Sequence, residues 1–350
     1  MSAFGPIGLP ETLAAVIVVA LNVYVLMGGA AFGGGGWELF ATGDRGNRQS
    51  ELIAQAIGPI WEANHVWLVV VVVLCFTGFP AAYAVLGTVL HIPLAILLVG
   101  IVMRGSAFVF RSYGARSWEQ RRRWGHTFAI ASTLTPLLLG VVIGALSTGA
   151  VGDAATRTGT APFIDVYVRP WFAPFPIAVG LLALALFAML AAVYLTLETR
   201  DTDLQDDFRR RALAAAGAVF VTAFAALAIA HSEAPMMRHG LVSSPWALPF
   251  QIATGAAALS AIWALWTRRY RVARITAAAQ VSLILWGWAF AQYPYVIPTT
   301  LTIRDAAAPS ITLEIVLWAL AGGGLILIPS LVYLRRTFAA RSPESGAPRR

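Results

Sequence analysis

Residues 58–68 read Gly-Pro-Ile-Trp-Glu-Ala-Asn-His-Val-Trp-Leu and open an apolar run that continues to residue 76. The whole segment is long enough to cross a bilayer as a helix, although a carboxylate, an amide and an imidazole lie in its first turns. An ionisable group in such a helix persists where it faces a bundle interior, a partner or water. On a helical wheel of about 100° per residue, four residues gather on one side: Trp61, Glu62, His65 and, at its flank, Asn64. We therefore expect this face to point into protein.

The composition excludes a soluble globular chain. Of the 350 residues, 58% are hydrophobic and 12% are charged, and the mean hydropathy is +0.72, which is typical of a polytopic membrane protein. The single cysteine, Cys75, lies in the second apolar run, so no intrachain disulfide can form. The 25 basic residues are all arginine, and their placement decides what the net charge of +8 means.

Nine segments satisfy the requirement of roughly 20 apolar residues per membrane span. They are residues 9–32, 58–79, 81–103, 126–148, 174–197, 212–231, 248–266, 275–293 and 310–333. We predict a single all-α integral membrane domain over residues 1–340 and a disordered tail at residues 341–350. The turn at residues 77–80 should fold the second and third spans into an antiparallel hairpin.

The arginines divide unequally between the two sides of such a nine-span chain. Most of the 25 fall in the loops after the first, third, fifth and seventh spans and after the ninth span. Because cytoplasmic loops carry the excess of positive charge, we place the N-terminus outside and the C-terminus in the cytoplasm. The basic runs at residues 121–123, 209–211 and 268–269 are then topology determinants and contacts for anionic lipid headgroups, rather than nucleic-acid sites.

Two interpretations of Glu62 remain open. It can be an interfacial carboxylate that caps its helix or reaches the headgroups, or a buried carboxylate that conducts protons. Counted from the turn at residues 77–80, Arg104 lies about 7.5 Å further along the axis than Glu62 at roughly 1.5 Å per residue, a gap that a long guanidinium nearly covers. Arg104 therefore either pairs with Glu62 or faces headgroups.

His65 and His91 raise the alternative of a heme held by two histidines between the second and third spans. The same count separates them by about 7.5 Å along the axis, whereas two ligands of one iron lie at nearly the same depth. We therefore favour a hydrogen-bonded interior histidine over a heme ligand. The roles of His91 and of Glu314, early in the ninth span, stay undecided.

Residues 28–36 form a glycine-rich stretch, Gly-Gly-Ala-Ala-Phe-Gly-Gly-Gly-Gly. No Lys-Ser/Thr pair follows it and no strand precedes it, so a phosphate-binding loop is a poor interpretation. Small residues in a membrane helix, here and at Gly140, Gly144 and Gly149, favour close packing of neighbouring helices.

Four stretches, taken in order, resemble subunit II of the cytochrome bd family of quinol oxidases. They are residues 58–68, quoted above and similar to the hallmark segment of that family; residues 103–112, with Met-Arg-Gly and Phe-Arg-Ser; Gly140, Gly144 and Gly149; and residues 293–307, which begin Tyr-Pro-Tyr-Val-Ile-Pro-Thr-Thr-Leu-Thr-Ile. The resemblance runs from about residue 10 to residue 335.

The resemblance implies a fold of two four-helix bundles plus a ninth, peripheral helix, in a multi-pass protein of the bacterial inner membrane. It also implies a heme-free subunit whose partner, subunit I, carries two b hemes, one d heme and the quinol-oxidising loop. The complex would oxidise quinol, reduce dioxygen to water and take protons from the cytoplasm. Which quinone is used, whether a structural quinone binds here, and whether a small single-helix subunit joins are left open.

The family's acidic residue after the tryptophan corresponds to Glu62. The residues that we predict for the cytoplasmic start of a proton route are Glu62, His65, Asn64 and Arg104. Trp61 and Trp67 are predicted to pack at the subunit boundary or against a quinone, and neither a catalytic residue nor a metal ligand is expected in this chain. The family commonly has one or two acidic residues in the segment closing its first helix, where this chain has Ala31, which leaves open whether part of the route is lost.

Two other functions remain as alternatives. Glycine-rich helices and interior charges also occur in secondary transporters, which would need inverted repeats that we do not find in the sequence. A self-contained membrane cytochrome b would carry its own heme, and the absorption spectrum of the separately purified chain distinguishes it.

Overall fold

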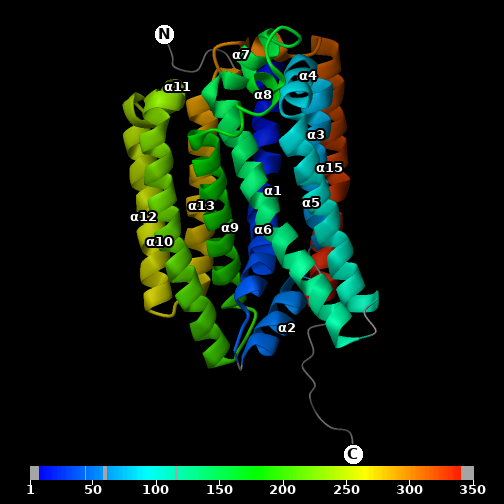
Figure 1. The fold of residues 1–350 in the computed structure, drawn as a ribbon, viewed down its shortest axis with the longest axis vertical. Coiled ribbons are helices and arrows are strands. Elements are labelled where there is room, and N and C mark those ends of the chain that lie inside the picture. Colours follow the sequence, from blue (N-terminus) through cyan, green and yellow to red (C-terminus); the bar gives the residue numbers. More distant parts are fainter. Residues whose placement is uncertain (1–7, 44, 58–60, 115–116, 340–350) are drawn as a thin grey trace, which may run out of the picture.

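Long helices run side by side along the height of the protein in the computed structural model (Figure 1). The structure describes residues 8–43, 45–57, 61–114 and 117–339. The long helices are α1 (Leu9–Trp37), α3 (Trp61–Gly78), α5 (His91–Val109), α6 (Trp118–Thr148), α9 (Pro174–Leu195), α10 (Thr202–Glu233), α12 (Ala247–Trp266), α13 (Tyr270–Gln292) and α15 (Ser310–Ala339). The shorter elements are η1 (Glu38–Phe40), α2 (Gly46–Ile57), α4 (Pro80–Val89), η2 (Phe110–Gly114), α7 (Ala150–Thr156), α8 (Phe163–Tyr167), α11 (Pro235–Ser243), α14 (Ile303–Ala306) and two antiparallel strands, β1 (Tyr295–Ile297) and β2 (Leu301–Thr302).

The predicted all-α membrane protein is confirmed, with one very short strand pair added to it. Within the part of the chain that the structure describes, eight helices are long and apolar enough to cross a membrane. A ninth span follows if α3 and α4, which bend by 114° at their junction, count as one. The topology, with the N-terminus outside and the C-terminus in the cytoplasm, stays a prediction.

The third predicted span is wrong in its bounds. Residues 81–103 do not form one helix, because α4 ends and α5 begins on either side of Leu90. Pro93 explains the break, since a proline has no N–H to donate to the carbonyl four residues earlier. α4 turns away from α3 instead of completing an antiparallel hairpin, so the depth count from residues 77–80 does not hold. Arg104 consequently lies inside α5 and not at its end.

Several helices continue into arginine-bearing segments where the apolar runs stop. α6 and α10 begin well before the predicted spans, and both starts are capped. The Ser117 hydroxyl accepts from the backbone N–H of Gln120 at 3.3 Å, and the Asp201 carboxylate accepts from that of Asp203 at 3.0 Å. α2 is an amphipathic helix that counting apolar residues does not detect. Charged residues thus end a hydrophobic segment without ending a helix.

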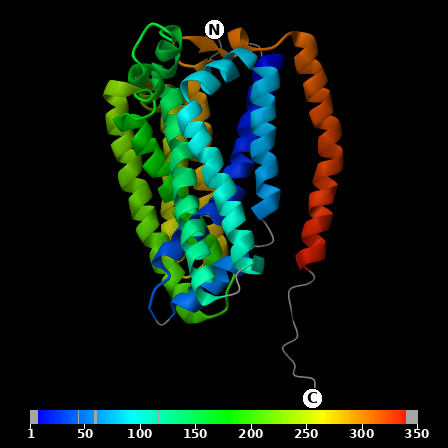
Figure 2. The ribbon, with the colours of Figure 1, turned by 45° about the vertical axis from the view of Figure 1, so that its right-hand side comes forward.

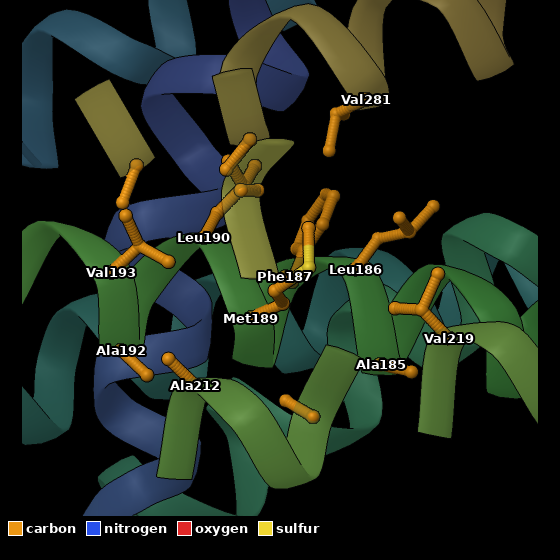
Figure 3. Close-up of a cluster of buried hydrophobic side chains, with 14 of the residues drawn as sticks. Ala185, Leu186, Phe187, Met189, Leu190, Ala192, Val193, Ala212, Val219 and Val281 are labelled. Carbon is orange, nitrogen blue, oxygen red and sulfur yellow. The ribbon is translucent and has the colours of Figure 1, made fainter. Parts of the chain in front are cut away.

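α6 and α9 are the most enclosed helices. In the most apolar window of each, 56% of the residues are buried, against 6% for α15. Buried side chains of α9 pack with residues of α1, α10 and α13 in one core cluster. Figure 3 shows part of it, with Leu186 and Phe187 of α9 gathered beside Val219 of α10 and Val281 of α13.

Glycines let α1 and α6 approach α9 closely. A Cβ at Gly33 would overlap the backbone carbonyl of Phe187, and one at Gly144 would lie 2.7 Å from the Cα of Pro176. The opposing atoms are backbone atoms, so they cannot move aside as a flexible side chain would. The predicted role in helix packing is confirmed for Gly33 and Gly144. Gly149 instead lies between α6 and α7, where its φ of 80° suits a glycine.

The helices pack in two neighbouring sets. In the N-terminal half α1 contacts α3 and α6, and α6 contacts α5. In the C-terminal half α9 contacts α10 and α13, and α12 contacts both of these, while α9 also contacts α1 and α6. α15 packs against α1 and α3 and stands at the edge of the molecule in Figure 2. The division into two four-helix bundles stays a prediction.

The two ends of the molecule differ. One end carries α2 and the α5–α6, α9–α10 and α12–α13 connections (Figure 1), which include Arg200, Arg268 and Arg269. We call it the arginine-rich end. The opposite end carries α4, α7, α8, α11 and the strand pair.

Candidate functional site

Arg104 is buried among α1, α5 and α6. It is 1% exposed, and its guanidinium carbon lies 4.4 Å from the centre of the Phe32 ring and 5.3 Å from that of Phe128. Its Nε–H donates to Oγ of Ser132 at 3.2 Å. The sequence leaves two alternatives for Arg104, a pair with Glu62 or a side chain that faces the lipid headgroups. The second alternative is therefore wrong.

This buried charge has no counter-charge among the described side chains. None of the ion pairs between described residues includes Arg104, and its Nη2 has no hydrogen-bond partner there. Removing a guanidinium from water costs several kcal/mol, by rough estimate, unless an opposite charge or several hydrogen bonds compensate. The interior around Arg104 therefore requires a negative or strongly polar group.

Two polar residues of α3 approach the same part of α1. The His65 ring packs edge-on against Phe32 with the centroids 6.5 Å apart, so Phe32 contacts both His65 and Arg104. Asn64 is 1% exposed and lies against Gly28, where a Cβ would stand 2.5 Å from its Nδ2. Neither amide atom of Asn64 has a hydrogen-bond partner among the described residues. A buried amide normally finds a partner, and water is the usual one where no side chain serves.

A carboxylate that the sequence reasoning missed lies where α1 ends. The Glu38 side chain is 10% exposed, and its Oε1 accepts from Nη1 of Arg111 at 2.5 Å and from Oγ of Ser50 at 3.0 Å. Its Oε2 is buried and has no hydrogen-bond partner among the described residues. Ending the first span at residue 32 hides Glu38, because α1 continues to Trp37 and carries Glu38 into the protein.

Similarity to known proteins decides the family. The family model of cytochrome bd terminal oxidase subunit II matches residues 9–338. The chain belongs to this family. It is 30% identical over 238 residues to cytochrome bd ubiquinol oxidase subunit 2 of Bacillus subtilis, which covers 67% of each chain. It is 23% identical to cytochrome bd-I ubiquinol oxidase subunit 2 of Escherichia coli over an alignment of 334 residues, which covers 82% of each.

A solved structure of bd oxidase from Geobacillus thermodenitrificans shares the fold. The TM-score is 0.78 at 22% identity, and the match covers 95% of this chain and 99% of that one. As a cytochrome bd subunit II, the chain is a multi-pass protein of the bacterial inner membrane and one subunit of a bd-type quinol oxidase in respiratory electron transport. Subunit II implies a subunit I beside it in the complex.

Two of the predicted site residues, Trp61 and Glu62, have side chains outside the described part of the chain. The backbone of Trp61 and Glu62 forms the first turn of α3, but their side chains are not among those that the structure describes. A pair between Glu62 and Arg104 stays a hypothesis. Trp67 is half-buried and packs against the core cluster that contains Phe187, and its contact with a partner or a quinone also stays a hypothesis.

The structure does not bring His65 and His91 together. His91 starts α5 and is exposed, its ring packs on Tyr167 with the centroids 5.2 Å apart, and its Nδ1 lies 2.8 Å from the carbonyl oxygen of Thr88. His65, in contrast, contacts α1. Glu314 is exposed on α15. Among the described residues, no three His, Cys, Asp or Glu side chains gather as metal ligands would.

Proposed function

We propose that this chain is the heme-free subunit of its quinol oxidase and supplies protons from the cytoplasm to subunit I. Subunit I would then carry the two b hemes, the d heme and the quinol-oxidising loop. The residues of the proposed route are Glu62, His65, Asn64 and Arg104. The observation that carries the proposal is the burial of Arg104 beside His65 and Asn64, because such a charge inside a membrane subunit marks an ion or proton pathway.

We propose Glu62 as the acid that balances Arg104. It precedes His65 by three residues, which is about one helical turn, so the two residues share a side of α3. His65 contacts the same Phe32 ring on which Arg104 stacks. A carboxylate on that side would accept from Nη2 of Arg104 and could exchange a proton next to the unpaired amide of Asn64.

The orientation follows from the arginine distribution. α1 begins at the end opposite the arginine-rich end, and α15 finishes on the arginine-rich side (Figure 1), as an odd number of spans requires. If the arginine-rich end lies in the cytoplasm, the N-terminus is outside and the start of α3 is cytoplasmic. Protons that enter at Glu62 would then come from the cytoplasm.

Further partners are proposed from the resemblance to the family. Trp61 and Trp67 are proposed to contact subunit I or a structural quinone. A small single-helix subunit would bind at the periphery of the complex. Exposed apolar side chains on α5, such as Leu98 at 61% and Val102 at 56%, suit contact with lipid or with a neighbouring subunit.

Replacing Glu62 by Gln in the assembled complex tests the route. Oxygen reduction should slow by roughly tenfold or more, because a positioned proton donor is lost, while the absorption spectrum shows an unchanged heme content. Glu51→Gln is the matched control, because Glu51 is an exposed carboxylate on α2, close by in sequence. Unchanged turnover of the Glu62 variant would remove this residue from the route.

The heme content of the isolated chain tests the first part of the proposal. Purified apart from subunit I, the chain should show no Soret band. A bound heme would favour the self-contained membrane cytochrome b instead, and substrate uptake by the chain alone in vesicles would favour a transporter.

A further inference from the structure

The two carboxylate oxygens of Glu38 differ in their hydrogen bonding. Both of its donors, Nη1 of Arg111 at 2.5 Å and Oγ of Ser50 at 3.0 Å, bind the same oxygen, Oε1. Oε2 is buried without a hydrogen-bond partner among the described residues. A buried polar atom left in this state in a native protein needs an explanation, because it costs about 1–3 kcal/mol.

Asp207, at the same end of the molecule, shows the usual arrangement. Its side chain is 14% exposed, against 10% for Glu38. Its Oδ1 pairs with Nη2 of Arg45 at 3.2 Å, and its Oδ2 accepts from Nε2 of Gln49 at 2.8 Å. Protonating either oxygen of Asp207 would weaken one of these bonds. Protonating Oε2 of Glu38 removes the charge that Arg111 pairs with, but it blocks neither hydrogen bond, because Oε1 can still accept from both donors.

Glu38 also ends a row of positions on one face of α1. The row consists of Tyr24, Gly28, Phe32, Gly35 and Glu38, which follow one another at helical spacings of three or four residues. Polar side chains of other helices meet it in order: Asn64 at Gly28, His65 and Arg104 at Phe32, and Ser132 at Gly35. A Cβ at Gly35 would overlap the Ser132 hydroxyl, so the glycine leaves the room that this polar group needs.

The positions of the row lie close together along the axis of α1. At roughly 1.5 Å of rise per residue, Glu38 lies about 4.5 Å along the axis from Gly35 and about 9 Å from Phe32. Ser132 accepts from Arg104 at 3.2 Å, so the hydroxyl next to Gly35 already belongs to the Arg104 site. A bridging water would link the Glu38 carboxyl group to the Ser132 hydroxyl.

We propose that Glu38 takes up protons at the arginine-rich end and delivers them along this row to the residues around Arg104. The inference rests on the proposed function, in which those residues begin the route to subunit I. It adds the acid that supplies them with protons. In the uptake step, Oε2 receives a proton from hydronium and leaves a water behind. In the delivery step, the O–H gives this proton to a water beside Ser132 and the carboxylate re-forms. No electrons move.

Replacing Glu38 by Gln in the purified complex tests the proposal. The reduced complex is mixed with dioxygen and a pH-indicator dye, so that proton uptake and heme oxidation are followed in one sample. Uptake should slow about tenfold, less than the ~100-fold that a positioned donor can contribute, since water partly replaces it. The heme content should stay unchanged. No slowing would overturn the proposal.

Asp207→Asn is the matched control. It removes a carboxylate of similar burial that is likewise bonded to one arginine and one neutral donor, but it leaves the row on α1 intact. Proton uptake in this variant should remain close to that of the wild type. Equal slowing in the Glu38 and Asp207 variants would mean that Glu38 only joins helices, and the proposal would fail.

The same assay on Glu62→Gln separates the two proposals. Slow uptake in the Glu62 variant with normal uptake in the Glu38 variant overturns the role of Glu38 alone. Slow uptake in the Glu38 variant alone supports its role and removes Glu62. Normal uptake in both overturns the route through this subunit.

A second measurement covers the case in which Glu38→Gln does not assemble. Glu38→Asp keeps a carboxylate for Arg111 and therefore the ion pair. Infrared difference spectra between the oxidised and reduced complex should contain a carboxyl C=O band that shifts on this substitution, because a change of protonation at residue 38 would cause it. A spectrum that the substitution leaves unchanged would overturn the proposal.

Discussion

Arg104 in α5 and Arg211 in α10 have similar aromatic surroundings. Arg104 lies between two phenylalanine rings, and the guanidinium carbon of Arg211 lies 5.5 Å from the centre of Trp37 and 5.1 Å from that of Phe208. Each arginine has one buried Nη atom without a hydrogen-bond partner among the described residues. Stacking on aromatic rings suits a guanidinium because its face is weakly hydrated.

The two arginines differ in what else holds them. Arg211 is partly exposed and donates from Nη2 to the carbonyl of Phe40 at 2.8 Å and to Oε1 of Gln49 at 2.7 Å, which ties α10 to η1 and α2. Arg104 is 1% exposed, and its described hydrogen bond goes to a neutral hydroxyl. The contrast teaches that aromatic stacking alone does not identify a functional arginine. The proposed role of Arg104 rests instead on a charge kept in the interior with few polar contacts among the described residues.

Arg104→Gln should have the largest effect of any change that tests this contrast. With Glu62 as its counter-ion, the substitution would leave a buried carboxylate unpaired, at a cost of about 3–5 kcal/mol. The complex should therefore lose its heme absorbance at a lower temperature and turn over slowly. Arg211→Gln is the control and should cost about 1 kcal/mol, as expected for the loss of ordinary hydrogen bonds. Equal losses in the two variants would break the comparison.

A double-mutant cycle shows whether Glu62 is the partner of Arg104. Combining Glu62→Gln with Arg104→Gln removes both charges, so the double variant should be more stable than the summed single losses imply, by about 1–3 kcal/mol. Additive losses would show that the two residues do not interact.

Gly33→Ala should have the next largest effect, because Gly33, which follows Phe32, holds α1 against α9. The added methyl would overlap the carbonyl of Phe187, and overpacking of this kind costs about 1–3 kcal/mol. Gly36→Ala, in the same helix, is the control, because its Cβ would stand 3.4 Å from Oγ1 of Thr133 and should change stability by less than about 0.5 kcal/mol. Thermal loss of heme absorbance measures both, and similar values would contradict the backbone contact between α1 and α9.

Much of the helical fold was predictable, because long apolar runs have few alternatives in a membrane. The errors have local causes. Pro93 breaks the third predicted span at Leu90, and capping by Ser117 and Asp201 starts α6 and α10 among charged residues. A hydropathy count does not register either effect, because it responds to side-chain polarity and not to backbone hydrogen bonding.

The candidate site was predictable only in part. The helical face of residues 61–65 already indicated that Asn64 and His65 point into protein. Glu38 could not be found in this way, because its burial depends on Ser50 and Arg111, which reach it from two other elements, α2 and η2. Ala31 stands two turns before Glu38 on α1, is 3% exposed and packs in an apolar cluster. Such long-range contacts follow from the fold and not from local spacing.

The smallest effect is expected at the opposite end, where Nε of Arg304 donates to Oε1 of Glu11 at 2.5 Å. This hydrogen bond raises the pKa of Arg304, so its contribution is lost as the pH rises through that raised value, and it is also lost in acid, where the Glu11 carboxylate is protonated. Salt is therefore the useful variable, since ions at about 1 M screen an exposed pair beyond roughly 3 Å. Arg304→Gln should lower the melting temperature slightly at low ionic strength and not at high ionic strength, whereas the larger loss in Arg104→Gln should be the same at both. A salt-dependent loss in the Arg104 variant would show that solvent ions reach that charge, and the distinction between the interior and the ends of the molecule would fail.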